Sequence, residues 1–304
     1  MTRIKSLPAL AIVAAPLSVM LFGSPAAAAA PPGLIVFDSD RTGHYEIFTT
    51  DPSGGHVRQV TETRRFTSNI APDVSPGGRR IVFASSRAGH YELYAMRIDG
   101  SHVQRITRTR AAVSNFAPRF LPNGRQIVFV SDRTGHDEVF LARADGTHVR
   151  QLTHTSGTFE NDTPTVSPSG NQILFTSTRT SHSEIYSMDT SGRHVRRLTR
   201  SGLGVSNTTP AFSADGREIV FARAAAGHFE IFKMAANGSH VVQLTHTPVS
   251  VTNLSPSFSP DDQTIVFYSS LATHYEIYAM NADGSGLRRL TATNRPVSNT
   301  DPGF

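Results

Sequence analysis

Short apolar runs separated by polar turns recur along the chain from residue 33 onward. The first run contains the triplet Ile35-Val36-Phe37, and a triplet of the same kind begins after every further step of 46 residues. The later triplets begin at Ile81, Ile127, Ile173, Ile219 and Ile265. Self-similarity at this period is typical of propeller blades or of a solenoid. The pattern therefore predicts six copies of one structural unit.

Within one repeat, the pattern predicts four short strands. In the third copy, residues 118–120 open the first strand, and the apolar run 127–130 indicates a second strand that is covered on both faces. A third strand follows a His-x-Glu element, as over residues 92–96, and a turn with a glycine leads to a polar fourth strand, as over 102–107. No helical pattern of useful length follows residue 33. Each repeat is therefore predicted to be a four-stranded antiparallel sheet of blade size.

The two ends of the repeat array favour a closed ring over an open solenoid. The array begins with a second strand at residues 33–38 and ends after a lone first strand at residues 299–304. Neither fragment makes a blade, but together they complete one. Ring closure would pair them and remove an exposed sheet edge, whereas a solenoid would need capping repeats. We therefore predict an all-β, six-bladed β-propeller over residues 31–304, closed by pairing of the C-terminal strand with the N-terminal blade.

The motifs within these repeats resemble the TolB-type propeller repeat. The matching elements are Pro-Ser-Phe-Ser-Pro-Asp at 256–261, Ser-Asp-Arg-Thr-Gly at 131–135, Glu-Ile-Tyr at 276–278, Asn-Ala-Asp-Gly at 281–284 and Leu-Thr at 290–291. The strand tryptophan of that family is absent, because the chain contains no Trp. The segment before the repeats leaves no room for the α/β domain of the periplasmic Tol-Pal protein, which argues against a role in that envelope system. The resemblance implies a secreted propeller that binds a protein or a small ligand.

The N-terminal segment has the pattern of a secretory signal peptide. Two basic residues precede an apolar run over 7–22, and an alanine-rich stretch over 26–30 precedes two prolines. We predict a signal peptide over residues 1–30, cleaved near 28–30, and a location outside the cytoplasm, either secreted or in the periplasm or cell envelope. An uncleaved membrane anchor is the alternative. The mature chain is expected to contain no membrane span.

Composition limits the classes of partner and the means of stabilisation. The chain has no cysteine, so disulfides and lipoprotein attachment are excluded and packing must hold the fold together. The formal net charge of +5 falls when Arg3 and Lys5 are removed with the signal peptide, and the remaining excess is too small to imply nucleic-acid binding. We expect a monomer that binds a protein or a component of the cell envelope.

A His-x-Glu element occurs once in every repeat, and it has two interpretations. A histidine two residues from a glutamate is a candidate metal site or a base beside its orienting acid. Six equivalent active sites set apart by ring symmetry are improbable, so we interpret the pair as scaffold that satisfies buried backbone or the neighbouring Ser-Asp-Arg loop. The residues are His44, His90, His136, His182, His228 and His274, with Glu46, Glu92, Glu138, Glu184, Glu230 and Glu276.

One asparagine in each repeat precedes the innermost strand. Six amides at the channel mouth are candidate contacts for a common ligand, while turn capping through bonds to local backbone is the alternative. The residues are Asn69, Asn115, Asn161, Asn207, Asn253 and Asn299.

Acidic residues break the repeat at one end of the predicted ring. In the connection after the third repeat, Glu160 and Asp162 flank Asn161, and Asp137 stands where four other repeats carry an aromatic residue. Asp301 occupies a position that is Ala, Thr or Ser in the other repeats. Because these carboxylates would attract a cation or a basic partner, we predict a ligand site formed by Glu160, Asp162 and Asp301. The site would take calcium, another divalent cation or a basic ligand, and sequence drift in a tolerant loop is the alternative.

These features favour a non-enzymatic, exported propeller that binds a protein or small ligand at one channel mouth, with no obligatory cofactor. The alternative is a carbohydrate-active enzyme of the uronate-lyase type that uses a metal at the channel mouth. A regulatory propeller of a serine peptidase is a third interpretation, but the sequence contains no Gly-x-Ser-x-Gly element.

Overall fold

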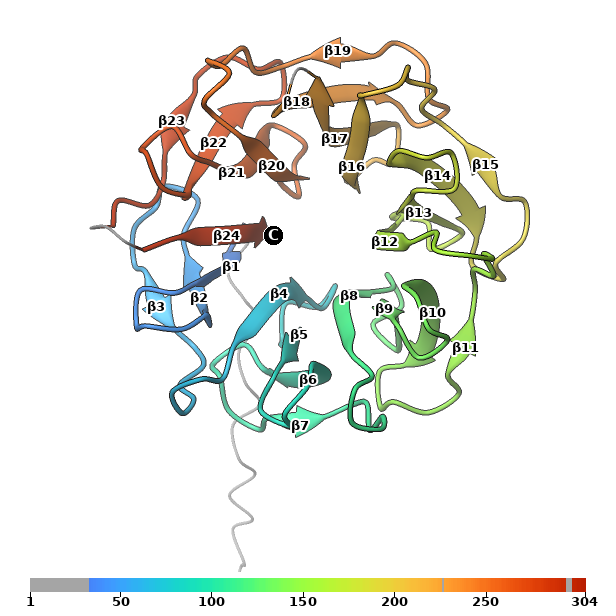
Figure 1. Ribbon diagram of the computed structural model, residues 1–304. Coiled ribbons are helices and arrows are strands. Elements are labelled where there is room, and N and C mark those ends of the chain that lie inside the picture. The colour runs from blue at the N-terminus through green and yellow to red at the C-terminus, as the bar shows by residue number, and fades with distance from the viewer. Residues whose placement is uncertain (1–32, 226, 294–296) are drawn as a thin grey trace, which may run out of the picture.

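Six four-stranded antiparallel sheets surround a central channel; five of them are formed by consecutive strands, and the sixth combines strands from both ends of the chain (Figure 1). The computed structural model describes residues 33–225, 227–293 and 297–304. Blade 1 contains β24, β1, β2 and β3, and blades 2 to 6 contain β4–β7, β8–β11, β12–β15, β16–β19 and β20–β23. The predicted six-bladed propeller is confirmed.

Strands at equivalent places in the six blades have similar bounds. The innermost strands are β24 (Asn299–Gly303), β4 (Asn69–Val74), β8 (Asn115–Phe120), β12 (Asn161–Val166), β16 (Ser206–Phe212) and β20 (Asn253–Phe258). The second strands are β1 (Ile35–Ser39), β5 (Arg80–Ser85), β9 (Gln126–Ser131), β13 (Gln172–Ser177), β17 (Glu218–Ala225) and β21 (Thr264–Ser269). The third strands are β2 (Glu46–Thr50), β6 (Glu92–Arg97), β10 (Glu138–Arg143), β14 (Glu184–Asp189), β18 (His228–Ala235) and β22 (Glu276–Asn281). The outermost strands are β3 (Arg58–Gln59), β7 (Gln104–Arg105), β11 (Arg150–Gln151), β15 (Arg196–Arg197), β19 (Val242–Gln243) and β23 (Arg288–Arg289).

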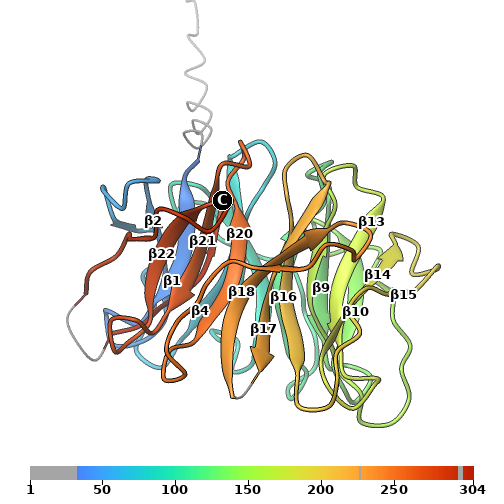
Figure 2. The same cartoon turned by 90° about the horizontal axis from the view of Figure 1, so that it is seen from above.

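The C-terminal strand closes the ring, as predicted. β24 pairs antiparallel with β1, with Asn299 opposite Ser39 and Gly303 opposite Val36. The C-terminus and the start of β1 therefore lie at the same end of the ring, as Figure 2 shows. Because the last strand completes the blade that the first strand begins, neither strand leaves an unpaired edge at this junction.

The apolar core lies between neighbouring blades. Val128 and Val139 of blade 3 pack with Ile173 and Phe175 of blade 4, and all four side chains are fully buried. The second strands read as unbroken apolar runs because both of their faces are covered in this way. Within each blade, the buried phenylalanine of the second strand stacks on an aromatic ring of the third, as Phe175 does on Tyr186 at 5.8 Å between ring centroids. Interlocked sheets of this kind explain how packing alone holds the fold.

Each innermost strand contains a bulge that faces the channel. The pairing register shifts after the second residue of the strand, or after the third in β16, and the next residue has a positive φ although it is not glycine. We call these six residues the bulge ring. The bulge ring consists of Ala71, Ala117, Thr163, Thr209, Ser255 and Asp301, with φ between 46° and 51°. Asp301 is its one charged member.

The two ends of the blades differ in the elements that they carry. We call the end with the connection from second to third strand, marked by the pair Ser131 and Glu138, the loop end. The opposite end, marked by the pair Gln126 and Arg143, carries the tight hairpin turns, and we call it the turn end. The part of the chain that the structure describes contains no helix long and apolar enough to cross a membrane. The predicted signal peptide over 1–30 lies outside the described residues.

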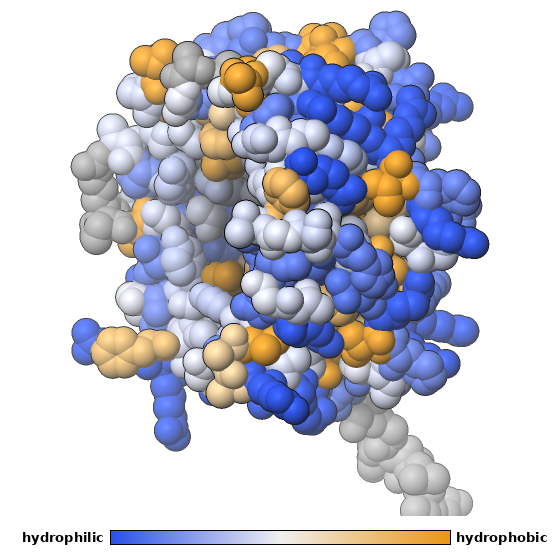
Figure 3. Space-filling view, turned by 45° about the vertical axis from the view of Figure 1, so that its right-hand side comes forward, coloured by the Kyte–Doolittle hydropathy of each residue, from blue (hydrophilic) through white to orange (hydrophobic). Residues whose placement is uncertain are grey.

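The surface shown in Figure 3 is mainly hydrophilic, and its hydrophobic side chains are scattered. The most exposed large apolar residues of the described chain are Leu203, Phe66 and Val249, which belong to three different connections between blades. Scattered apolar residues need no partner to cover them. Recognition by this face therefore depends on polar and charged groups.

Candidate functional site

The His-x-Glu element is the centre of a hydrogen-bond network at the loop end. In blade 3, the fully buried Glu138 carboxylate accepts hydrogen bonds from the Thr155 backbone N–H at 2.6 Å and from the Asn161 amide of blade 4 at 2.9 Å. His136 Nε2 lies 2.9 Å from the same carboxylate. Burial raises the pKa of Glu138, but hydrogen bonds from Thr153 and Thr155 outweigh burial and hold the pKa below its ordinary value. The carboxylate therefore joins two blades.

The same network recurs around the ring. Each of the six glutamates is buried, and in five blades the histidine Nε2 lies 2.9 to 3.0 Å from the carboxylate. In blade 5 the corresponding distance, from His228 to Glu230, is 3.6 Å. The partners are backbone and threonine groups, and the Ser-Asp-Arg loop joins the network through its arginine. This geometry is consistent with a scaffold role for the pair.

Five of the six asparagines link the carboxylate of one blade to the arginine of the next. Asn161 donates to Glu138 and accepts a hydrogen bond from Arg179 Nη2 at 2.9 Å. All six asparagines are fully buried, and they are not among the residues that line the channel. The amide groups form hydrogen bonds with side chains and do not cap a turn by bonding to the backbone two residues later in the chain. A ring of amides facing a common ligand therefore finds no support here and stays a prediction.

One blade lacks the arginine of this network. Arginine guanidinium groups bond the asparagine in the other five blades and lie over two aromatic rings, as Arg179 does over Tyr186 at 4.6 Å. In blade 6 the corresponding residue is Leu271, and the buried Asn253 Oδ1 has no hydrogen-bond partner. The remaining pairs are Arg41 with Asn299, Arg87 with Asn69, Arg133 with Asn115 and Arg223 with Asn207.

Carboxylates line the central channel. The channel has a cavity of about 570 Å³, and its lining includes Asp73, Asp162 and Asp301 with a single basic residue, Arg119. Burial raises the pKa of Asp73 to about 6, although the nearby Arg119 lowers it. Burial likewise raises the pKa of Asp162, and the negative charge of Asp301 adds to the shift. Two of the predicted contacts, Asp162 and Asp301, therefore line one cavity, and the charge of Asp301 acts on Asp162.

A fourth carboxylate lies beneath the channel wall. Asp38 is 1% exposed and accepts hydrogen bonds from the Thr300 hydroxyl at 2.6 Å and from the Ala71 backbone N–H at 3.1 Å. Burial, together with the charge of Asp301, raises its pKa well above the ordinary value. Asp301 in turn accepts a hydrogen bond from the Ser255 hydroxyl at 2.8 Å. The sequence reasoning missed Asp38.

A signal for Asp38 was present in the repeat. The equivalent residues of the other five blades are Ala84, Val130, Thr176, Ala222 and Tyr268, and none of them is acidic. The same comparison that singled out Asp301 would therefore have found Asp38.

The third predicted contact, Glu160, lies at the rim of the loop end. Its side chain is exposed, and its carboxylate accepts a hydrogen bond from the Asp137 backbone N–H at 3.2 Å. Burial and the adjacent Glu160 raise the pKa of Asp137 to about 7. Glu160 also adds to the raised pKa of Asp162. Acidic groups therefore continue from the channel wall to the rim.

This arrangement creates a strong preference for positive charge. Three carboxylates and one arginine share the cavity, and the charge of Asp301 contributes to the raised pKa values of Asp38 and Asp162, so a cation would be stabilised there. Within the residues that the structure describes, however, no three His, Asp or Glu side chains are grouped as metal ligands would be. The expectation of a calcium site therefore rests on charge and not on a coordination set.

Known proteins share this fold. A family model described as the TolB beta propeller domain matches residues 109–304. The structure of TolB from Acinetobacter baumannii matches with a TM-score of 0.75 at 24% sequence identity, covering 89% of this chain and 66% of that chain. The structure of the putative TolB from Agrobacterium tumefaciens matches with a TM-score of 0.67 at 23% identity, covering 85% of this chain and 87% of that chain. No curated protein sequence matches this chain.

Enzymes with related propellers also match. An oligogalacturonate lyase from Vibrio parahaemolyticus gives a TM-score of 0.53 at 13% identity, covering 77% of this chain and 71% of that chain. At such identities, structural likeness demonstrates the fold alone. The family match over residues 109–304 extends over more than half of the sequence. Together with the six closed blades, it means that the chain belongs to the TolB beta propeller domain family.

Proposed function

We propose that the protein is a non-enzymatic binding propeller that takes a positively charged segment of a protein, or a small basic ligand, at the loop end of its channel. The observation that carries this proposal is that Asp73, Asp162 and Asp301 line one cavity with a single arginine, Arg119. Asp162 and Asp301 are the direct contacts, and Glu160 attracts the ligand at the rim. Asp38 lies behind Asp301 and strengthens the negative field.

A comparison of charge variants tests the proposal. Short fluorescent peptides of equal length, one rich in arginine and lysine and one rich in glutamate, would be titrated with the protein at low and moderate salt. The double variant Asp162→Asn/Asp301→Asn should weaken binding of the basic peptide by about tenfold or more, because hydrogen-bonded charge pairs are lost. The matched control, Asp261→Asn/Asp283→Asn, removes the same charge from two exposed turns and should bind almost as the parent does.

Calcium and a chelator make a separate arm of the same experiment. If calcium raises the melting temperature of the parent but not of Asp162→Asn/Asp301→Asn, the ligand is a divalent cation. If the basic peptide binds the channel variant and the control variant equally, the channel-mouth proposal is wrong.

We further propose that the mature protein works outside the cytoplasm. The sequence pattern of residues 1–30 supports export, and membership in the TolB propeller family agrees with a role at the cell envelope. Cell fractionation with N-terminal sequencing of the mature protein tests this proposal. Recovery of the protein in the cytoplasmic fraction with residues 1–30 intact would contradict it.

A lyase function is the second candidate, because oligogalacturonate lyases are among the enzymes with a related propeller. The histidines of the six His-x-Glu pairs do not line the channel, and each lies close to a glutamate of its own blade. We therefore favour binding. Incubation with oligogalacturonide and manganese, with detection of an unsaturated product, decides between the two.

A further inference from the structure

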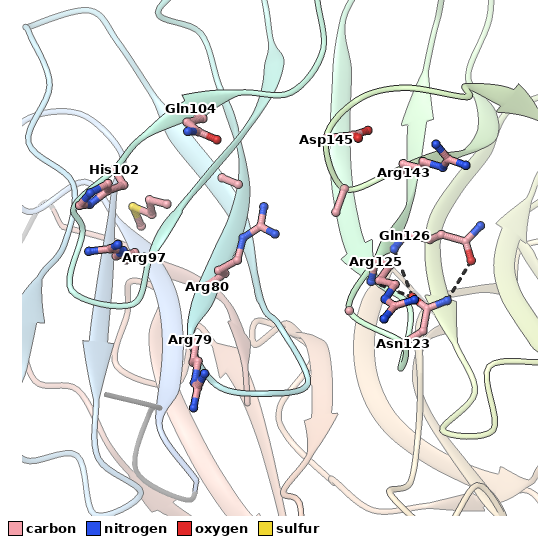
Figure 4. A pocket seen from close by; sticks show the side chains of 14 residues that line it. Arg79, Arg80, Arg97, His102, Gln104, Asn123, Arg125, Gln126, Arg143 and Asp145 are labelled. Carbon is pink, nitrogen blue, oxygen red and sulfur yellow. Dashed lines mark hydrogen bonds between the residues drawn. The ribbon is translucent and has the colours of Figure 1, made fainter. Parts of the chain in front are cut away.

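A groove opens between blades 2 and 3 at the turn end of the ring. Its volume is about 980 Å³, and hairpins of both blades supply its walls (Figure 4). Arg80 and Arg97 face each other in the register of β5 and β6, at the opposite end of these strands from the pair Ser85 and Glu92. The groove is therefore separate from the loop-end network and from the contacts proposed for the channel mouth.

Five arginines line this groove. Arg79, Arg80 and Arg97 belong to the wall from blade 2, and Arg125 and Arg143 belong to the facing wall from blade 3 (Figure 4). None of the five is in an ion pair within the part of the chain that the structure describes. Arg97 is near the charge of Asp99, Arg143 is near that of Asp145, and Arg80 lies over the Phe120 ring at 5.7 Å. Five guanidinium groups in one groove nevertheless repel one another, which opposes gathering them.

The groove contains a single acidic side chain, Asp145. Its carboxylate accepts hydrogen bonds from the Thr147 backbone N–H at 2.9 Å and from the Thr147 hydroxyl at 2.7 Å. These bonds fix the carboxylate in the turn between β10 and β11. One carboxylate cannot neutralise five arginines, so the groove keeps an excess of positive charge.

The floor of the groove is apolar. Ala95, Met96 and Ala144 are buried and line it, and the one ring that lines the groove is the imidazole of His102. An occupant must therefore present negative groups to the walls and small or apolar groups to the floor. Binding of nucleic-acid strands commonly uses aromatic platforms for successive bases, and a single imidazole does not form such a series.

The other blades serve as an internal comparison. The position of Arg97 and Arg143 is held by Asp51, Asp189, Ala235 and Asn281 in the other four blades. The position of Arg79 and Arg125 is Asn171 in blade 4 and Gln263 in blade 6. Blades 4 to 6 have the same hairpins, and at these two positions they carry only one arginine, Arg217 of blade 5, so the fold does not require the cluster. A ligand that contacts blades 2 and 3 explains it.

We propose that this groove binds an extended acidic segment of a partner protein, in which carboxylates alternate with small or apolar residues. In an extended chain, successive side chains point to opposite sides, so one set reaches the arginines while the other covers Ala95, Met96 and Ala144. Guanidinium groups bind carboxylates with two parallel hydrogen bonds, which a lysine cannot do. The groove is thus a second interaction surface, independent of the proposed channel-mouth site.

Peptide titration tests the proposal. Fluorescence anisotropy would follow an alternating Glu-Ala peptide, a peptide of the same composition with its glutamates grouped, and an alternating Lys-Ala peptide. The alternating acidic peptide should bind most tightly, with an affinity that falls as salt is raised. Arg97→Glu/Arg143→Glu should weaken this binding by about tenfold or more, because two charge pairs become repulsive.

Two further variants keep the test decisive. The control Arg288→Glu/Arg289→Glu makes the same charge change on the exposed strand β23 and should change affinity by less than about twofold. Arg97→Lys/Arg143→Lys keeps the charge and the fold but should lose affinity, because lysine cannot form the paired bonds. Melting temperatures of all variants show whether they are folded.

Competition identifies the class of ligand. Polygalacturonate and inorganic phosphate would be added to the complex with the alternating acidic peptide. The unlabelled alternating acidic peptide is the third competitor. The proposal is supported if it displaces the fluorescent peptide at a lower concentration than polygalacturonate or phosphate does. Tighter binding of polygalacturonate, or equal affinity of the parent and Arg97→Glu/Arg143→Glu for the acidic peptide, would overturn it.

Discussion

At the scale of single residues, the channel and the loop-end network use carboxylates in opposite ways. Glu92 is buried, but hydrogen bonds from Thr107, Thr109 and Arg105 outweigh burial and lower its pKa to about 2. Asp73 accepts a backbone hydrogen bond from Phe120 at 2.7 Å, but burial dominates and its pKa rises to about 6. The first kind of carboxylate stabilises the fold at neutral pH, while the second kind opposes it. A carboxylate that destabilises the fold is a candidate for function.

Stability should therefore pass through a maximum as the pH is changed. Groups such as Glu92 contribute stability that is fully present above pH 4.5, the ordinary pKa, and is lost as the pH falls toward about 2. Groups such as Asp73 bind protons more tightly in the folded state, so stability decreases as the pH rises from 3.8 toward about 6. Asp137 extends this decrease to about pH 7. The melting temperature should be highest in mildly acidic solution.

The variant Asp73→Asn isolates one of these contributions. Asparagine keeps an oxygen for the Phe120 N–H but cannot ionise, so the variant should be more stable than the parent by about 1 to 2 kcal/mol at neutral pH. At pH values below 4 the two proteins should have similar melting temperatures. The control variant is Asp261→Asn. A hydrogen bond from Ser259 lowers the pKa of the exposed Asp261, so this substitution should change stability in the opposite direction at neutral pH. A difference between Asp73→Asn and parent that does not change with pH would refute this assignment.

The missing arginine of blade 6 provides a second prediction. In Leu271→Arg, the guanidinium group should donate to the unpaired Asn253 Oδ1 and lie over the rings of Phe267 and Tyr278, as its counterparts do in five blades. A buried acceptor without a partner costs about 1 to 3 kcal/mol, and the cation over the rings adds about 0.5 to 1 kcal/mol. Part of this gain is offset because Leu271 packs against the apolar core.

Urea denaturation measures the outcome. Leu271→Arg should raise the midpoint, while Leu271→Gln, which lacks the cation, should raise it less or not at all. If the midpoint of Leu271→Arg is at or below that of the parent, the added arginine gains nothing from Asn253 or from the two aromatic rings, and the prediction is wrong.

At the scale of elements, the repeat pattern predicted the order of the strands but not all of their lengths. The predicted fourth strand at 102–107 is reduced to Gln104–Arg105. His102 has a positive φ of 57°, which breaks the strand, and the Thr107 hydroxyl accepts the Leu93 N–H inside the blade. The bulge ring was also missed, because alanine, threonine and serine carry no sequence signal for a positive φ.

A glycine present in every repeat has a purpose that the sequence alone did not reveal. Gly146 has a φ of 85°, and a Cβ atom there would collide with the backbone carbonyl of Ile106 in the preceding blade. Gly135 has a similar φ of 99° but open space around it. The turn glycines therefore allow neighbouring blades to approach each other closely.

Alanine substitutions of Gly135 and Gly146 distinguish backbone strain from a collision between neighbouring blades. Gly135→Ala should lower the free energy of unfolding by about 1 to 2 kcal/mol through backbone strain alone. Gly146→Ala should cost about 1 to 3 kcal/mol more, because the two blades must move apart. Chemical denaturation of both variants checks the difference. Equal losses would mean that contact between blades is not the constraint at Gly146.

At the scale of the whole molecule, the sequence was sufficient for the ring and insufficient for the site. Six copies at a constant step predicted the number of blades, and the two incomplete ends predicted closure by β24, which its pairing with β1 confirms. The candidate site depends on three-dimensional proximity that no repeat encodes. Asp38 and Asp301 are 263 positions apart in the sequence, yet the charge of one raises the pKa of the other. The basic groove likewise forms only when two blades stand side by side.

The most direct test of the channel-mouth site is calorimetry of proton release. Burial raises the pKa of Asp73 in the channel to about 6, and a bound positive charge would lower it, so binding near pH 6 must release protons. Titration of the basic peptide in two buffers with different ionisation enthalpies should reveal this release for the parent, and a much smaller release for Asp162→Asn/Asp301→Asn. Binding of the basic peptide to the parent with no release of protons, or with proton uptake, would contradict the account.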